Sequence, residues 1–193
     1  MTTQQLNLFA GWSAYASAGA AILGMVFILI FFRAGEPFGS LNDLSIAVQV
    51  LLMLPVALAL HRALPSGALS TVSLIVLIAL VFGVVALATG SVLLVLRKIS
   101  LEQSFRPPFN NYWLIGIWLV IASLLAISAH TLSGGPGWLG VITGIAWITL
   151  GLGMWIGGTA AQQSFPVVVG GLVGMIGYIV YAVLLALHFL KAA

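Results

Sequence analysis

The sequence predicts an all-α protein, a polytopic membrane bundle of six transmembrane helices. Only 5% of its 193 residues are charged and 62% are hydrophobic, and the mean hydropathy is +1.24. A soluble domain carries charges at roughly a quarter of its positions, so this chain could not cover a globular surface with polar groups. The expected solvent is therefore lipid, in which only helices or closed barrels satisfy the backbone.

Six apolar runs come close to the roughly 20 residues that a helix needs to cross a bilayer. None alternates between apolar and polar residues as a barrel strand does. The predicted spans cover residues 14–32, 44–60, 68–96, 112–129, 138–158 and 165–190. The third and sixth exceed the membrane thickness, so we expect tilt or projection into the interface. The short connections leave no room for a second unit, so residues 1–193 are expected to form one domain.

The ends of the predicted spans carry residues typical of helix boundaries. Aromatic rings that favour the membrane interface stand near them at Trp12, Tyr112, Trp113, Trp138, Trp155 and Phe165. Asn42 or Asp43 is well placed to cap the second span, because a side-chain oxygen there accepts a bond from a free backbone N–H. Pro55 lies within the same span and is expected to kink it.

The basic residues of the loops predict an orientation. The connections after the first, third and fifth spans contain Arg33, Arg97, Lys98 and Arg106, whereas the side of the termini contains Arg62 and Lys191. Cytoplasmic loops carry an excess of Lys and Arg. We therefore expect both termini to lie outside.

A short polar stripe opens the second span. Asn42, Ser45 and Gln49 follow one another at spacings of three and four residues, which places them on one helix face. In lipid such side chains seek partners on a neighbouring helix or line a small wet cavity. The sequence leaves both interpretations open, and the cavity would be entered from the loop that precedes the stripe.

Three histidines end the second, fourth and sixth spans on one side of the membrane, at His61, His130 and His188. Three imidazoles at one level could bind Zn or Cu, or two could hold a haem. No carboxylate lies on that side of the chain, and a histidine at a helix C-terminus is also stabilised by the helix dipole. The sequence is compatible with either a metal site or a structural role for these histidines. No cofactor is evident from the sequence.

Glycines are concentrated in the last two predicted spans. Three pairs have the GxxxG spacing that lets helix backbones approach closely, namely Gly140 and Gly144, Gly153 and Gly157, and Gly170 and Gly174. Such faces pack helices within one chain or dock another membrane protein.

The motifs of familiar enzymes are missing. The chain has no cysteine, Gly-rich phosphate loop, nucleophile elbow or HExxH motif, and no predicted span carries an acid at its centre. We therefore expect a protein without catalytic chemistry, an accessory or structural subunit of a membrane complex. A carrier or binder of a small lipophilic ligand is the alternative, and a His-based metal or haem enzyme is the third. Lipids and another membrane protein are the expected partners, and nucleic acid is not.

Two stretches carry a family resemblance, "GEPFGSLNDLSIAVQVLLMLPVALALHRAL" and "GGPGWLGVITGIAWITLGLG". They resemble a broad, uncharacterised group of small bacterial membrane proteins with six transmembrane helices, in which an "LPxALAL-aromatic-R" ending and a "PxWLGxxxG" beginning recur. His61 stands where that group more commonly has an aromatic residue. The resemblance implies the helix layout and residence in a bacterial inner membrane, and it implies no site.

Overall fold

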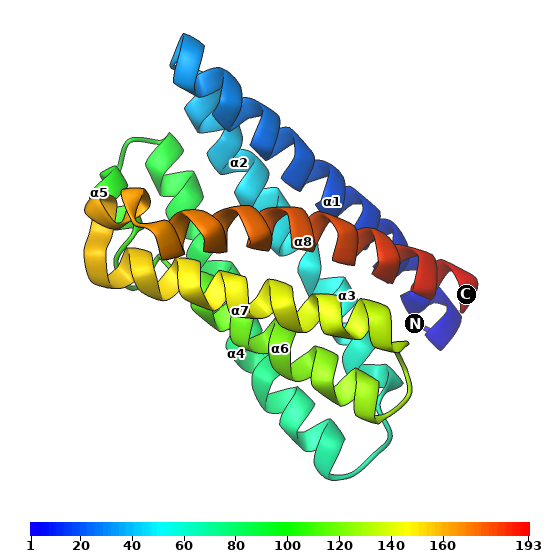
Figure 1. The fold of residues 1–193 in the computed structure, drawn as a ribbon. Helices are drawn as coiled ribbons and strands as arrows, with labels where there is room; N and C mark the ends of the chain where they lie inside the picture. Colours follow the sequence, from blue (N-terminus) through cyan, green and yellow to red (C-terminus); the bar gives the residue numbers. More distant parts are fainter.

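Eight α-helices and one short 3₁₀ helix make up the computed structural model, which describes residues 1–193 (Figure 1). The long helices are α1 (Thr3–Ala34), α2 (Phe38–Leu51), α3 (Met53–Ala63), α4 (Ala68–Val95), α6 (Tyr112–Ser128), α7 (Gly134–Gly157) and α8 (Phe165–Lys191). The short ones are α5 (Leu101–Ser104) and η1 (Gly158–Gln163). The chain contains no strand, as the sequence predicted.

Five helical segments are long and apolar enough to cross a membrane: α1, α2 continued by α3, α4, α7 continued by η1, and α8. The remaining apolar helix, α6, has 17 residues. At 1.5 Å per residue it is about 25 Å long, slightly less than the hydrocarbon layer of about 30 Å. The chain is an integral membrane protein and a helical bundle.

The second span begins earlier than the sequence predicted. Helix α2 starts at Phe38 with Pro37 before it, so neither Asn42 nor Asp43 is the cap and that prediction is wrong. Glu36 supplies the missing acceptor, because its Oε2 atom accepts bonds from Ser40 N at 3.2 Å and Ser40 Oγ at 3.0 Å. Asp43 therefore lies inside the helix, in its second turn.

The predicted interruption of the second span is present. Helix α2 ends at Leu51 and α3 begins at Met53. Pro55 has no N–H to donate to the carbonyl of Leu51, and its ring crowds that carbonyl. The Ser17 hydroxyl of α1 donates to the carbonyl of Gln49 at 2.8 Å, which ties α1 to this part of α2.

The long helices form a closed ring in chain order. Helix α1 packs on α2 and α3, α2 on α4, α4 on α6, α6 on α7, α7 on α8, and α8 returns to α1. Both termini lie at one end of the bundle (Figure 1), where Asn7 Nδ2 donates to the carbonyl of Ala192 at 3.2 Å. Helices α5 and η1 lie side by side at the opposite end.

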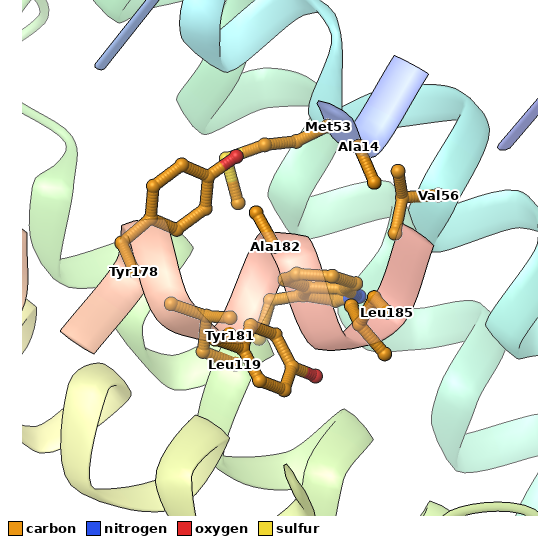
Figure 2. Close-up of a pocket in the computed structure, with 9 residues that line it drawn as sticks. Ala14, Met53, Val56, Leu119, Tyr178, Tyr181, Ala182 and Leu185 are labelled. Atoms are coloured by element: carbon orange, nitrogen blue, oxygen red, sulfur yellow. The ribbon is translucent and has the colours of Figure 1, made fainter. Parts of the chain in front are cut away.

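The centre of the ring is filled by side chains. Figure 2 shows Tyr178 and Tyr181 of α8 around a cavity of only about 10 Å³, which holds at most one water molecule. Both hydroxyls have partners, since Tyr178 bonds Ser17 and Tyr181 lies 3.2 Å from Ser123 Oγ. The core is packed, and its buried tyrosines are satisfied.

Helices α6 and α7 touch backbone to backbone. A Cβ atom added to Gly144 would lie 2.6 Å from the carbonyl oxygen of Gly116 and 2.9 Å from the nitrogen of Val120. A Cβ atom at Gly116 would lie 2.5 Å from the carbonyl oxygen of Gly144. Only glycine fits at either position, because neither neighbour is a flexible side chain that could move aside.

The other predicted glycines also face elements of the same chain. Gly140 contacts Ser123 and Tyr181, Gly153 contacts Val167, Gly157 contacts Ala161, Gly170 contacts the backbone of Ala146, and Gly174 contacts Trp147. These contacts join α7 to α6, α8 and η1. The glycines therefore lie at joints within the bundle.

We predict that Gly144→Ala lowers the free energy of unfolding by about 1–3 kcal/mol, the usual cost of overpacking. The added methyl group must push α6 away from α7. The matched control is Gly19→Ala on α1, where a Cβ atom has no neighbour within 4 Å. Helix propensity predicts that this control gains up to about 1 kcal/mol. Unfolding in mixed detergent micelles measures both, and equal stabilities would contradict the close packing of α6 and α7.

Candidate functional site

A cavity with a mixed, mostly apolar lining lies at the α5 end of the bundle, between α2, α4, α5 and the start of α6. Its volume is about 70 Å³, enough for a few water molecules. The polar lining consists of Asp43, Ser91, Ser104, Asn110 and Tyr112, and apolar side chains such as Ile46, Leu87 and Phe109 complete it. Several of these residues, Asp43 and Ser104 among them, are partly exposed, so the cavity reaches the surface.

Asp43 is the only charged residue in the lining. The single ion pair of the whole chain joins Arg106 to Glu102, so Asp43 has no cationic partner. Its only side-chain hydrogen bond is a long one of 3.5 Å from Asn42 Nδ2. A carboxylate that is half-buried at the end of a membrane helix without a partner is costly, and such residues commonly mark functional sites.

Asn110 supplies a second unsatisfied group. Its side chain is nearly inaccessible, with 3% of the residue exposed. The Nδ2 atom donates to the carbonyl oxygens of Phe105 and Gly151, both at 3.1 Å, which fixes the orientation of the amide. The Oδ1 atom is left buried without a partner. A buried acceptor without a donor costs about 1–3 kcal/mol, so a donor or a cation is expected beside it.

The short helix α5 covers one side of the cavity, because its Leu101 and Ser104, and Phe105 directly after it, belong to the lining. Ser100 begins this helix with a capping box, in which its hydroxyl accepts from Gln103 N at 3.2 Å. The carboxyl-terminal side of the helix leads into the loop that carries Asn110. The cover and the buried amide therefore belong to one segment between α4 and α6.

Ionic and backbone contacts tie α5 to the turn after α7. Glu102 Oε2 accepts from Thr159 N at 3.0 Å, and Glu102 Oε1 accepts from Arg106 Nη2 at 2.9 Å. Arg106 Nη1 also donates to the carbonyl of Trp155 at 3.3 Å. Gly158 has a φ of +56° and lies directly against the Glu102 carboxylate, a place that a larger residue would fill. The backbone N–H of Thr159, helped by Arg106, holds the pKa of Glu102 below its usual range.

The predicted polar stripe does not line this cavity. Asn42 and Ser45 pack against Gly24 of α1, where an added Cβ atom would lie 3.4 Å from Asn42 Oδ1 and 3.3 Å from Ser45 Cβ. Ser45 Oγ donates to its own helix, to the carbonyl of Leu41 at 2.8 Å. Gln49 is buried, and its carbonyl accepts the bond from Ser17. The stripe contacts a neighbouring helix, and the cavity opens on the adjacent face of α2.

The three histidines are not brought together. His61 lies in the last turn of α3, with Nδ1 3.1 Å from Ser73 Oγ. His130 is exposed in the turn after α6, and His188 is in the last turns of α8. No group of three or more His, Asp or Glu residues in the chain could hold a metal ion. The three histidines therefore do not form a three-residue metal site in this geometry.

The sequence did not single out three polar residues of the cavity, Ser91, Ser104 and Asn110. Ser91 follows Thr89 and Gly90 near the end of the third predicted span, Ser104 stands in the polar connection after that span, and Asn110 stands just before the fourth predicted span. Small and polar residues such as these are common in turns and helix contacts, so they do not by themselves predict a binding site. They become relevant because they share a cavity with Asp43, which the sequence assigned to a helix cap.

Comparison with known proteins adds no relative. No protein-family model matches the chain, and no curated protein or solved structure matches it either. The resemblance to small bacterial membrane proteins with six helices therefore stays a prediction.

We predict that Glu102→Gln lowers stability at neutral pH and that the deficit relative to the wild type shrinks in acid. A carboxyl group whose folded-state pKa is depressed contributes stability above its unfolded pKa and loses it as the pH falls through the folded value. The ordinary glutamate value is near 4.5, so the two proteins should converge below that pH. Thermal unfolding between neutral pH and pH 3 checks this, and a deficit that stays constant across the range would contradict it.

Proposed function

We propose that the protein binds a small polar solute in the cavity between α2, α4, α5 and α6. One observation carries this proposal: the same cavity is lined by Asp43, whose carboxylate has no cationic partner, and by Asn110, whose buried Oδ1 atom has no hydrogen-bond partner. Elsewhere in the core, buried hydroxyls such as those of Tyr178 and Tyr181 have partners. Unsatisfied polar groups that converge on a surface-connected cavity are typical of a binding site.

The size of the cavity favours a small solute over the lipophilic ligand that the sequence suggested. Sites for drug-sized ligands have volumes of roughly 300–1,000 Å³, whereas this cavity measures about 70 Å³. Its charged and amide groups also suit a polar species better than a hydrocarbon. The proposal therefore keeps a ligand-binding role and changes the class of ligand.

We further propose that α6 crosses the membrane together with the five longer segments, which gives six spans. Both termini lie at the same end of the bundle (Figure 1), joined by the bond between Asn7 and Ala192. An odd number of crossings would place them on opposite sides of the bilayer. Slight thinning of the bilayer or burial of the flanking turns accommodates a helix as short as α6.

We also propose that the cavity lies on the cytoplasmic side. The α5 end carries Arg33, Arg97, Lys98 and Arg106, and the end with the termini carries Arg62 and Lys191. The excess of basic residues supports a cytoplasmic α5 end. Residence in a bacterial inner membrane is proposed on the family resemblance alone.

The predicted role of accessory subunit has less support than solute binding. The role follows from the absence of enzyme motifs, and the glycine pairs were its suggested docking face; these glycines contact α6, α8 and η1 of the same chain. The outer faces of α7 and α8 are apolar, with Ile142 and Ile176 more than half exposed. Lipid tails solvate such apolar faces as readily as a protein partner would cover them. The exposed faces therefore do not favour membership of a membrane complex.

We predict that Ser91→Cys reacts with a small methanethiosulfonate reagent and that Ser123→Cys does not. The chain has no native cysteine, so each variant carries a single thiol. Ser91 is 8% exposed and lines the cavity, whereas Ser123 is 0% exposed between α6 and α8. Charged, impermeant reagent should label Ser91→Cys in inside-out vesicles and leave it unlabelled in right-side-out ones. If both variants are equally inert, the cavity is closed and the proposed function fails.

A further inference from the structure

We propose that the bound solute is a small monovalent cation, held between the carboxylate of Asp43 and the Oδ1 atom of Asn110. This inference rests on the proposed function and names the class of solute. It draws on the charge of the cavity, the chemistry of its polar atoms and its volume.

The charge of the cavity is negative and uncompensated. Asp43 is its only charged residue, and no Lys, Arg or His side chain lies within 4.0 Å of its carboxylate. The nearby cation Arg106 is already engaged by Glu102 and by the carbonyl of Trp155. An anion would be repelled here, and a neutral solute would leave the carboxylate without a counter-charge. A cation would provide the missing partner.

The polar side chains that line the cavity offer mainly oxygen atoms. They are the carboxylate of Asp43, the amide of Asn110, whose nitrogen is already bonded to two carbonyls, and the hydroxyls of Ser91, Ser104 and Tyr112. The Ser104 hydroxyl donates its proton to the carbonyl of Leu101 at 2.6 Å, which leaves its oxygen lone pairs free. Oxygen ligands suit alkali ions and also accept the N–H bonds of ammonium groups. Transition metals favour imidazole or sulfur ligands, which are missing from the lining.

A single carboxylate argues for one positive charge. Divalent calcium takes six to eight oxygen ligands, commonly from several carboxylates. The other acid on α2's side, Glu36, has its Oε2 atom engaged by Ser40. No group of three His, Asp or Glu residues occurs that could hold a more highly charged ion.

The volume favours a small cation. A water molecule needs about 10–15 Å³ of such cavity space, so a volume of about 70 Å³ holds a few water molecules or a small ion with part of its hydration shell. An alkali ion with one or two waters, ammonium or methylammonium fits this space. A bulky organic cation such as N-methyl-D-glucamine does not, which makes it the natural control ion.

The test uses Ser104→Cys as a reporter, because this residue lines the cavity and its hydroxyl faces its own backbone. The rate of thiol labelling is measured at constant chloride and ionic strength in Na⁺, K⁺, ammonium, methylammonium or N-methyl-D-glucamine. At a cation concentration ten times the dissociation constant, the free fraction and hence the rate should fall about tenfold. Protection by Na⁺ or K⁺ identifies an alkali-ion site, and protection by the ammonium ions alone identifies an amine site.

The contrasting variants are Asp43→Asn and Glu36→Gln in the same reporter. Each removes one carboxylate from the same end of α2, and only Asp43 lines the cavity. We expect Asp43→Asn to abolish the protection of the reporter thiol by small cations. Its labelling rate in N-methyl-D-glucamine should match that of the parent reporter, and this match also shows that the variant folds. Glu36→Gln should stay protected.

Equal labelling rates of the Ser104→Cys parent in all five ions would overturn the inference. This outcome does not depend on whether the Asp43→Asn variant folds. Protection that survives Asp43→Asn, or that Glu36→Gln abolishes equally, would also overturn it. In each of these cases a reactive Ser91→Cys variant would still support binding of a different solute, so the two proposals fail separately.

Discussion

The backbone contact between Gly116 and Gly144 is the interaction on which the rest of the bundle depends. Lipid provides no hydrophobic drive between helices, so association relies on close packing. The glycine face of α7 continues to Gly151, where an added Cβ atom would lie 2.5 Å from the nitrogen of Trp113. This closeness brings the carbonyl of Gly151 within 3.1 Å of Asn110 Nδ2. The packing of α6 on α7 thereby sets the amide that faces the candidate site.

The contrast between the core and the cavity marks the site. In the centre, the tyrosines of α8 pair with serines of α1 and α6, so the demand that buried polar groups be satisfied is met. At the α5 end, Asp43 lacks a counter-ion and Asn110 lacks a donor. One further buried orphan, Thr143 Oγ1, lies against Gly177 between α7 and α8 and outside the described cavities. Only at the α5 end do two unsatisfied groups share a space.

Hydropathy predicted the helical membrane bundle, because lipid restricts the chain to a few solutions, and Pro55 predicted the interruption of the second span. The site was not predictable in the same way. Asp43 was placed at a helix cap, since the role of Glu36 as the acceptor for Ser40 depends on the geometry of the turn. The side chain of Asn110 is oriented by a hydrogen bond to the carbonyl of Gly151, which lies 41 positions away in the sequence. The polar stripe that begins at Asn42 was predicted from its spacing. The sequence does not say whether this face of α2 or the adjacent face with Asp43 packs against α1, because that depends on how the two helices pack.

The central claim is that Asp43 and Asn110 hold a small cation within a packed ring of helices. The most direct measurement is a crystal structure of the protein in Rb⁺, which resembles K⁺ and ammonium in size and is located by its anomalous scattering. We expect an anomalous peak inside the cavity, within bonding distance of both the Asp43 carboxylate and the Asn110 Oδ1 atom. A cavity that contains only water or a lipid chain, with no peak beside these two residues, would contradict it.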